Sequence, residues 1–116
     1  MDTIHRFDAG PRMSKAVRHG ETIYTMGHVA QDRTGDIAAQ TADVLSRLDS
    51  TLAKMGSEKS KLLSVTIYIS DMEGFSAMNE VWDAWVDNPN APARTTVGAP
   101  LAAPDILVEM TAVASV

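Results

Sequence analysis

The sequence contains no cysteine among its 116 residues. Disulfide bonds, thiolate zinc sites and cysteine nucleophiles are therefore excluded. A chain without cysteine is compatible with the cytoplasm, and its N-terminal segment carries neither an apolar signal core nor a basic leader. No apolar run approaches the roughly 20 residues that a membrane-spanning helix needs. We therefore expect a cytoplasmic protein with no membrane partner.

Positive charge is also scarce. Ten Lys and Arg face fifteen Asp and Glu, the formal net charge is -5, and no run of basic residues occurs. Because nucleic acids and anionic membrane surfaces are bound through basic patches, we expect neither as the main partner. The sequence has no glycine-rich phosphate loop, and its three histidines lack the spacing of a metal site. We expect neither a metal nor a cofactor.

What the sequence does contain is one set of periodic segments, of a length typical of a single domain over residues 1–116. Apolar residues at three- and four-residue spacing predict a helix over 37–55, with Asp36 as its N-cap and Gly56 just past its end. A second helix is predicted over about 72–86, after Asp71. Alternation predicts six strands, at 3–8, 14–19, 22–29, 63–70, 94–99 and 105–115.

The predicted order is β-β-β-α-β-α-β-β. Two helices cannot cover both faces of a six-stranded sheet, so we expect them on one face, in an α+β two-layer domain. The other face would carry alternate residues such as Thr66, Tyr68, Glu109 and Thr111. This mixed surface is too apolar to be left wholly in water, which indicates an oligomer or a ligand platform.

Arg94 begins a predicted strand directly after Pro92-Ala93, whose proline stiffens the backbone. A guanidinium held in this way can bind a carboxylate through two parallel hydrogen bonds. Thr96 lies on the same side of the strand and would suit a small ligand beside the arginine. The alternative is an arginine whose charged end reaches from the strand into solvent.

Glu109 stands alone in the apolar run Ile106–Val113. If burial removes water from its carboxylate, the pKa of a glutamate rises and the group can transfer protons near neutral pH. The alternative is a solvent-facing position on a half-buried strand. Asn79 lies on the predicted apolar side of the second helix, and a buried asparagine needs hydrogen-bond partners. It ties down a loop or reaches a ligand.

The segments P-A-R-T-T-V-G-A-P-L and P-D-I-L-V-E-M-T-A-V-A, with R-M-S-K-A-V-R-H-G-E-T-I-Y-T-M-G-H-V-A near the start, resemble the RidA/YjgF family of imine deaminases over nearly the whole chain. The resemblance implies a chorismate-mutase-like subunit with a mixed sheet, assembled as a homotrimer with three clefts between subunits. It also implies hydrolysis of 2-imino acids or their enamine tautomers to 2-keto acids and ammonia, without metal or cofactor. A non-catalytic module that binds a small carboxylate or regulates a partner is the alternative.

The resemblance also implies roles for individual residues. Arg94 of the P-A-R motif would bind the substrate carboxylate, and Glu109 would position or activate water. Asn79 would contribute to the pocket, and Gly27 would offer backbone groups to the substrate.

This chain departs from the family's pattern at four positions that the resemblance places in the pocket. Met13 stands where a tyrosine is usual, Met26 and His28 flank Gly27 in place of S-G-Q, and Thr96 replaces a frequent cysteine. The resemblance therefore predicts a more apolar pocket with its own substrate preference.

Overall fold

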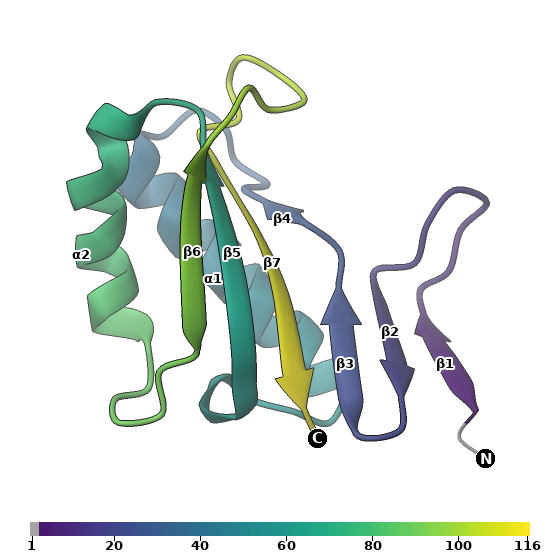
Figure 1. Ribbon diagram of the computed structural model, residues 1–116. Coiled ribbons are helices and arrows are strands. Elements are labelled where there is room, and N and C mark those ends of the chain that lie inside the picture. Colours follow the sequence, from purple (N-terminus) through teal and green to yellow (C-terminus); the bar gives the residue numbers. More distant parts are fainter. Residues whose placement is uncertain (1–2) are drawn as a thin grey trace.

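Two helices cover one face of a β-sheet and leave the other face bare (Figure 1). The computed structural model describes residues 3–116. The helices are α1 (Ile37–Lys54) and α2 (Phe75–Trp85), with 3-10 turns η1 (Lys59–Lys61) and η2 (Met72–Gly74). The strands are β1 (Ile4–Phe7), β2 (Ala16–His19), β3 (Thr22–Thr25), β4 (His28–Val29), β5 (Leu62–Ile69), β6 (Ala93–Gly98) and β7 (Val108–Ser115).

The sheet is mixed. Its strands lie in the order β1-β2-β3-β7-β5-β6, with β4 also paired to β7. The β5–β6 pair is parallel, whereas the pairs that β7 makes with β3, β4 and β5 are antiparallel. The α+β two-layer fold predicted from the sequence is thereby confirmed, and α1 crosses behind the central strands while α2 lies beside β6 (Figure 1).

Buried and more exposed side chains alternate along the two central strands, and the buried set forms the core. In β5, Val65, Ile67 and Ile69 are buried, and in β7 every second residue from Val108 to Ala114 is buried. These side chains pack against the apolar stripe of α1, including Val44, Leu45, Leu48 and Leu52. The intervening residues face the uncovered side, which we call the open face.

The start and end of α1 follow the sequence signals. The Asp36 carboxylate accepts a hydrogen bond from the backbone N–H of Ala39 at 2.9 Å, which satisfies one of the free donors at the helix start. Beyond Met55, Gly56 has φ +80°, a conformation that glycine adopts without steric cost. The predicted helix 37–55 is therefore confirmed to within one residue.

A buried amide fastens two loops to this helix. The side chain of Gln40 is 1% exposed; its Nε2 donates to the carbonyl of Asp105 at 3.0 Å and lies 3.3 Å from the carbonyls of Arg33 and Gly35. Its Oε1 accepts from the N–H of Leu107 at 3.0 Å. The connection into β7 is thus held by one glutamine, and β7 begins at Val108 rather than at residue 105.

The predicted strand 22–29 is interrupted, which corrects the sequence-based expectation. Both parts pair with β7, but the register changes by one residue between the pair Tyr24–Val113 and the pair His28–Met110. This is a β-bulge, and a one-residue slip moves the following side chains to the opposite face. The hydroxyl of Thr25 accepts the N–H of Ala112 at 3.0 Å and so fills the gap in the ladder.

Gln40→Leu should lower the free energy of unfolding by about 3 kcal/mol, because it leaves the Leu107 N–H and the loop carbonyls without their buried partner. Denaturant unfolding measures the change. Ser46→Ala, on the exposed side of the same helix, is the control and should change stability by less than about 0.5 kcal/mol. A loss below about 1 kcal/mol in Gln40→Leu would show that water replaces the amide.

Candidate functional site

Glu109 lies on the open face, in the middle of β7. It is half-buried between buried neighbours, and it stands opposite Tyr68 of β5 and Val29 of β4. It lines a cavity of about 390 Å³ together with Gly27, Tyr68, Thr111 and the turn 99–102. The carboxylate is therefore accessible to a small molecule from the open face.

Gly27 makes room for this carboxylate. A Cβ built on Gly27 would lie 2.0 Å from Oε2 of Glu109, well inside the contact distance. The backbone at the bulge therefore passes directly against the glutamate, and any side chain there would displace it. Sequence reasoning placed both residues in one site, and the structure brings them together.

Arg94 lies on the helix-covered side of the edge strand β6. It pairs with Val65 of β5 in parallel register, so its side chain shares the face of that buried valine. Its guanidinium carbon lies 5.3 Å from the ring centroid of Trp82 in α2, a favourable cation–π geometry. Since β6 ends the sheet order, no strand within residues 3–116 pairs with its far edge.

Two polar atoms on the same side of the molecule lack partners. Oδ1 of Asn79 and Oγ1 of Thr96 are buried and have no hydrogen-bond partner in the part of the chain that the structure describes. Thr96 follows Arg94 by two residues on the same face of β6, and Asn79 precedes Trp82 by one helical turn in α2. Buried polar atoms are rarely left unpaired, and those that are call for an explanation.

The two groups of residues face opposite sides of one sheet. Arg94, Thr96 and Asn79 belong to the helix-covered side, whereas Glu109 and Gly27 belong to the open face. A side chain cannot cross the sheet, so Arg94 and Glu109 of one protomer cannot hold the same small molecule. A joint site requires a second copy whose open face meets the free edge of β6.

The structure corrects the expected position of His28. The bulge turns this residue toward α1, where it is 1% exposed and its Nε2 lies 2.8 Å from Oγ1 of Thr51. His28 and Met26 line a different cavity, on the helix-covered side. Neither residue shares the Glu109 cavity, so neither joins Glu109 within the protomer.

Met13 lies in the loop between β1 and β2 and is 51% exposed. That loop rises at the same end of the sheet as β4 and the segment before β7 (Figure 1). Its role in substrate binding stays a prediction.

Sequence reasoning assigned Tyr68 to the open face but to no site. Its signal was the alternation of β5, which places it on the same side as Glu109, and the pairing of these two residues shows that they are direct cross-strand neighbours. Tyr68 is therefore the phenol available to the Glu109 cavity.

Over residues 3–116, the structure contains no cluster of three or more His, Asp or Glu side chains arranged to hold a metal ion. Within the same residues, no helix combines the length and the apolar character needed to span a membrane.

Comparison with known proteins identifies the family of this chain. The family model described as Endoribonuclease L-PSP matches residues 3–116. The RutC family protein YoaB of Escherichia coli (strain K12) is 45% identical over 114 residues, which cover 98% of this chain and 99% of YoaB. The chain belongs to the RidA/YjgF family.

Solved structures of RidA/YjgF proteins share this fold. NMB1025 of Neisseria meningitidis, described as a member of the YjgF protein family, is 42% identical with a TM-score of 0.95, covering 97% of this chain and 94% of that one. Rv2704 of Mycobacterium tuberculosis, described as a member of the YjgF/YER057c/UK114 family, is 28% identical with a TM-score of 0.88, covering 98% and 100%. The family resemblance and the chorismate-mutase-like fold expected from it are confirmed.

Gly27→Ala should displace the Glu109 carboxylate while the protein stays folded, because the added methyl meets the end of a flexible side chain rather than backbone. A crystal structure of the variant checks the displacement, and thermal unfolding checks the fold. Gly10→Ala is the control, since its Cβ would have Met13 O as its nearest contact, at 3.6 Å. An unmoved Glu109 beside Ala at position 27 would contradict the close packing.

The unfolding free energy should fall as pH drops below about 6.5. Burial, and secondarily the Arg47 guanidinium, lowers the pKa of His28 from its usual 6.5. The unfolded chain therefore takes up a proton at this histidine at a higher pH than the folded chain does, which favours unfolding in acid.

Urea unfolding at about pH 7.5 and 5.5, at one protein concentration, measures this effect. In His28→Gln the loss between the two pH values should shrink by about 1 kcal/mol, whereas the exposed His19→Gln control should keep the full loss. An unchanged loss in His28→Gln would exclude His28 as its source.

Proposed function

We propose that the protein hydrolyses reactive 2-imino acids, or their enamine tautomers, to 2-keto acids and ammonia in clefts between the subunits of a homotrimer. The observation that carries the proposal is the pair of buried, unpartnered atoms, Asn79 Oδ1 and Thr96 Oγ1, on the side of Arg94 at a free sheet edge. A polar ligand anchored on Arg94 would supply the partners that these atoms lack. Membership of the RidA/YjgF family, whose deaminases the sequence resembles, supports this chemistry.

The division of the site between two faces supports an intersubunit cleft. One wall holds the carboxylate anchor Arg94, and the other holds Glu109 against Gly27. The free edge of β6 and the open face are different surfaces, so a contact between them is heterologous, and it closes into a ring when the rotation between successive subunits allows. A trimeric ring, which the family resemblance implies, would create three equivalent clefts.

Each residue then has a definite task. The Arg94 guanidinium donates two hydrogen bonds to the substrate carboxylate and fixes the imine carbon. Asn79 Oδ1 can accept from the imine N–H. Glu109 of the adjacent subunit accepts a proton from water as the water oxygen bonds to the imine carbon, and the C=N π electrons move to nitrogen.

The resulting carbinolamine breaks down without a cofactor. Glu109 returns its proton to the nitrogen, then takes the hydroxyl proton and passes it to the same nitrogen, and the C–N bond breaks as the carbonyl forms and ammonia leaves. The sum is imino acid plus water giving keto acid plus ammonia. Because the imine is already reactive, orientation of substrate and water supplies much of the rate enhancement.

The matched family model is described as an endoribonuclease, which is a different chemistry. A net charge of -5 and the absence of a basic run disfavour a polyanionic substrate. The proposed substrate is therefore a small carboxylate rather than RNA.

Arg94→Ala and Glu109→Gln should each lower kcat/KM for imine hydrolysis by about 100-fold or more, because each removes a charged contact to the reacting species. An amino-acid oxidase can generate imines with different side chains, and semicarbazide trapping measures their decay. No acceleration of decay for any side chain by the unaltered protein would refute the proposal. A protein that binds a small carboxylate without accelerating decay would instead be the non-catalytic module.

Mixing the two inactive variants tests the shared cleft. In trimers assembled from equal amounts, about a quarter of the clefts should combine an intact Arg94 with an intact Glu109, and activity should return accordingly. The matched control mixes the unaltered protein with the double variant: shared clefts retain about a quarter of the activity, whereas clefts within single subunits retain about half. No recovery in the first mixture would contradict a shared site.

A further inference from the structure

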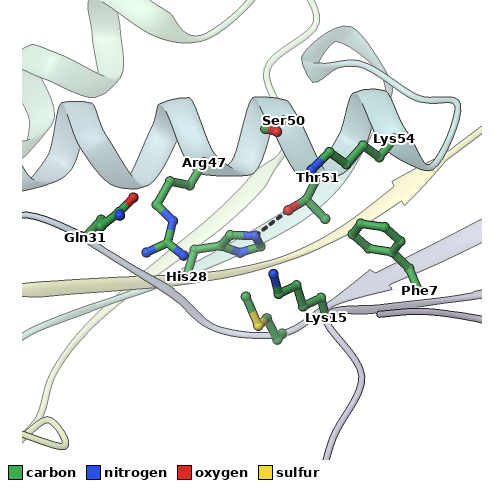
Figure 2. Close-up of a pocket in the computed structure, with 9 residues that line it drawn as sticks. Phe7, Lys15, His28, Gln31, Arg47, Ser50, Thr51 and Lys54 are labelled. Atoms are coloured by element: carbon green, nitrogen blue, oxygen red, sulfur yellow. Dashed lines mark hydrogen bonds between the residues drawn. The ribbon is translucent and has the colours of Figure 1, made fainter. Parts of the chain in front are cut away.

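A second cavity, of about 240 Å³, lies between α1 and the strands β1 to β4, on the side of the sheet opposite Glu109. Figure 2 shows its walls: Phe7, Lys15, His28 and Gln31 on one side, and Arg47, Ser50, Thr51 and Lys54 of α1 on the other, with Met26 completing the lining. We call it the cationic pocket. The imine chemistry proposed above does not use it.

The helix wall of the pocket is polar and partly exposed: Ser50 and Lys54 are exposed, Arg47 is half-buried and Thr51 is buried. Arg47, Ser50, Thr51 and Lys54 follow each other at intervals of three, one and three residues, so they form one stripe over two turns. Stripes of this spacing that face a sheet usually form the core. Here the stripe carries two cations and two hydroxyls into a cavity.

Positive charge is concentrated at this pocket. Lys15, Arg47 and Lys54 are three of only ten basic residues in a chain of net charge -5. Lys15 pairs with Asp8 at 2.9 Å, and Arg47 donates to the carbonyl of Val29 at 2.8 Å. Within residues 3–116, neither Arg47 nor Lys54 forms an ion pair.

Nearby carboxylates neutralise the pocket only in part, through the Asp8–Lys15 pair. Asp43, one turn before Arg47, accepts the backbone N–H groups of Gln31 at 2.8 Å and Asp32 at 3.1 Å. Among residues 3–116 Lys54 forms no ion pair, although Lys15 and, more weakly, Lys54 lower the pKa of Asp8, and the Lys54 Nζ lies 5.7 Å from the ring centroid of Phe7. An anion that enters the pocket would therefore meet cations from α1 and from the opposite wall. Of these cations, only Lys15 forms an ion pair within residues 3–116.

His28 supplies an independent sign that a partner is missing. It lines the pocket, it is 1% exposed, and its Nε2 is held by Thr51, but its buried Nδ1 has no hydrogen-bond partner among residues 3–116. An unpaired ring nitrogen in the wall of a polar cavity is satisfied when a ligand or water occupies that cavity.

We propose that the cationic pocket binds the phosphate group of a small phosphorylated molecule, held by Lys15, Arg47 and Lys54 with the Ser50 hydroxyl. Arg and Lys together with hydroxyl donors match the several acceptor oxygens of a phosphate. The cavity exceeds a phosphate group in size, and Phe7 and Met26 give it an apolar side for a short organic portion.

Calorimetric titration of the assembled, full-length protein in a phosphate-free buffer of low ionic strength tests the proposal. The probes are glycerol 3-phosphate, inorganic phosphate, succinate and uncharged glycerol. We expect glycerol 3-phosphate to bind saturably with Kd at or below about 1 mM, and glycerol not to bind. Tighter binding of the ester than of inorganic phosphate identifies a phosphorylated metabolite as the source, and equal binding identifies free phosphate.

Variants locate the binding. Lys54→Gln should raise Kd for glycerol 3-phosphate about tenfold, and Lys15→Gln combined with Lys54→Gln should raise it further. Lys61→Gln removes an equal charge from an exposed lysine outside the pocket and should leave Kd unchanged. Thermal unfolding without ligand confirms that each variant folds.

Three outcomes would overturn the proposal: no saturable binding of either phosphate up to about 10 mM, equal weakening by Lys61→Gln, or succinate binding as tightly as the phosphates. Because none of these measurements uses imine turnover, their failure is separate from failure of the proposed hydrolysis.

Discussion

The alternation of side chains along β5 and β7 is the constraint on which the rest of this structure depends. Each strand gives one set of residues to the helices and the other to the open face. Two helices can bury only the first set, and the core is complete on that side. The second set, with Tyr68, Glu109 and Thr111, remains uncovered in the protomer. Core formation and an incomplete site therefore have the same cause.

The same alternation explains how far the sequence could predict the molecule. Period-two strands, the α1 stripe and the Asp36 cap are local signals, and they predicted the two-layer fold correctly. The relation of Arg94 to Glu109 depends on which strands pair and on which faces they share. The sequence identifies Arg94 and Glu109 as candidates by their residue types. That they lie on opposite faces of the sheet follows only from the strand order and register.

His28 shows where sequence reasoning reaches its limit. On a continuous strand over 22–29, it would share the face of Tyr24 and lie with Glu109. One extra residue at the bulge reverses this and sends His28 to α1. The hydrophobic pattern does not reveal the bulge, because Met26 and Gly27 are compatible with either face of the sheet. The bulge is recognised from the register change and from the hydrogen bond between the Thr25 hydroxyl and the N–H of Ala112. Both depend on how the strands pair.

The bulge also brings the Glu109 cavity and the cationic pocket into contact with one short segment. Met26 and His28 line the cationic pocket, and Gly27 between them lies against the Glu109 carboxylate on the opposite face. Since a Cβ at Gly27 would overlap Oε2 of Glu109, the glutamate has little tolerance for movement of this backbone. Met26 and Gly27 form the connection between β3 and β4, and His28 is the first residue of β4, so a backbone shift at either neighbour would reach Gly27. The backbone that makes room for Glu109 on the open face is thus continuous with the wall of the cationic pocket on the other face.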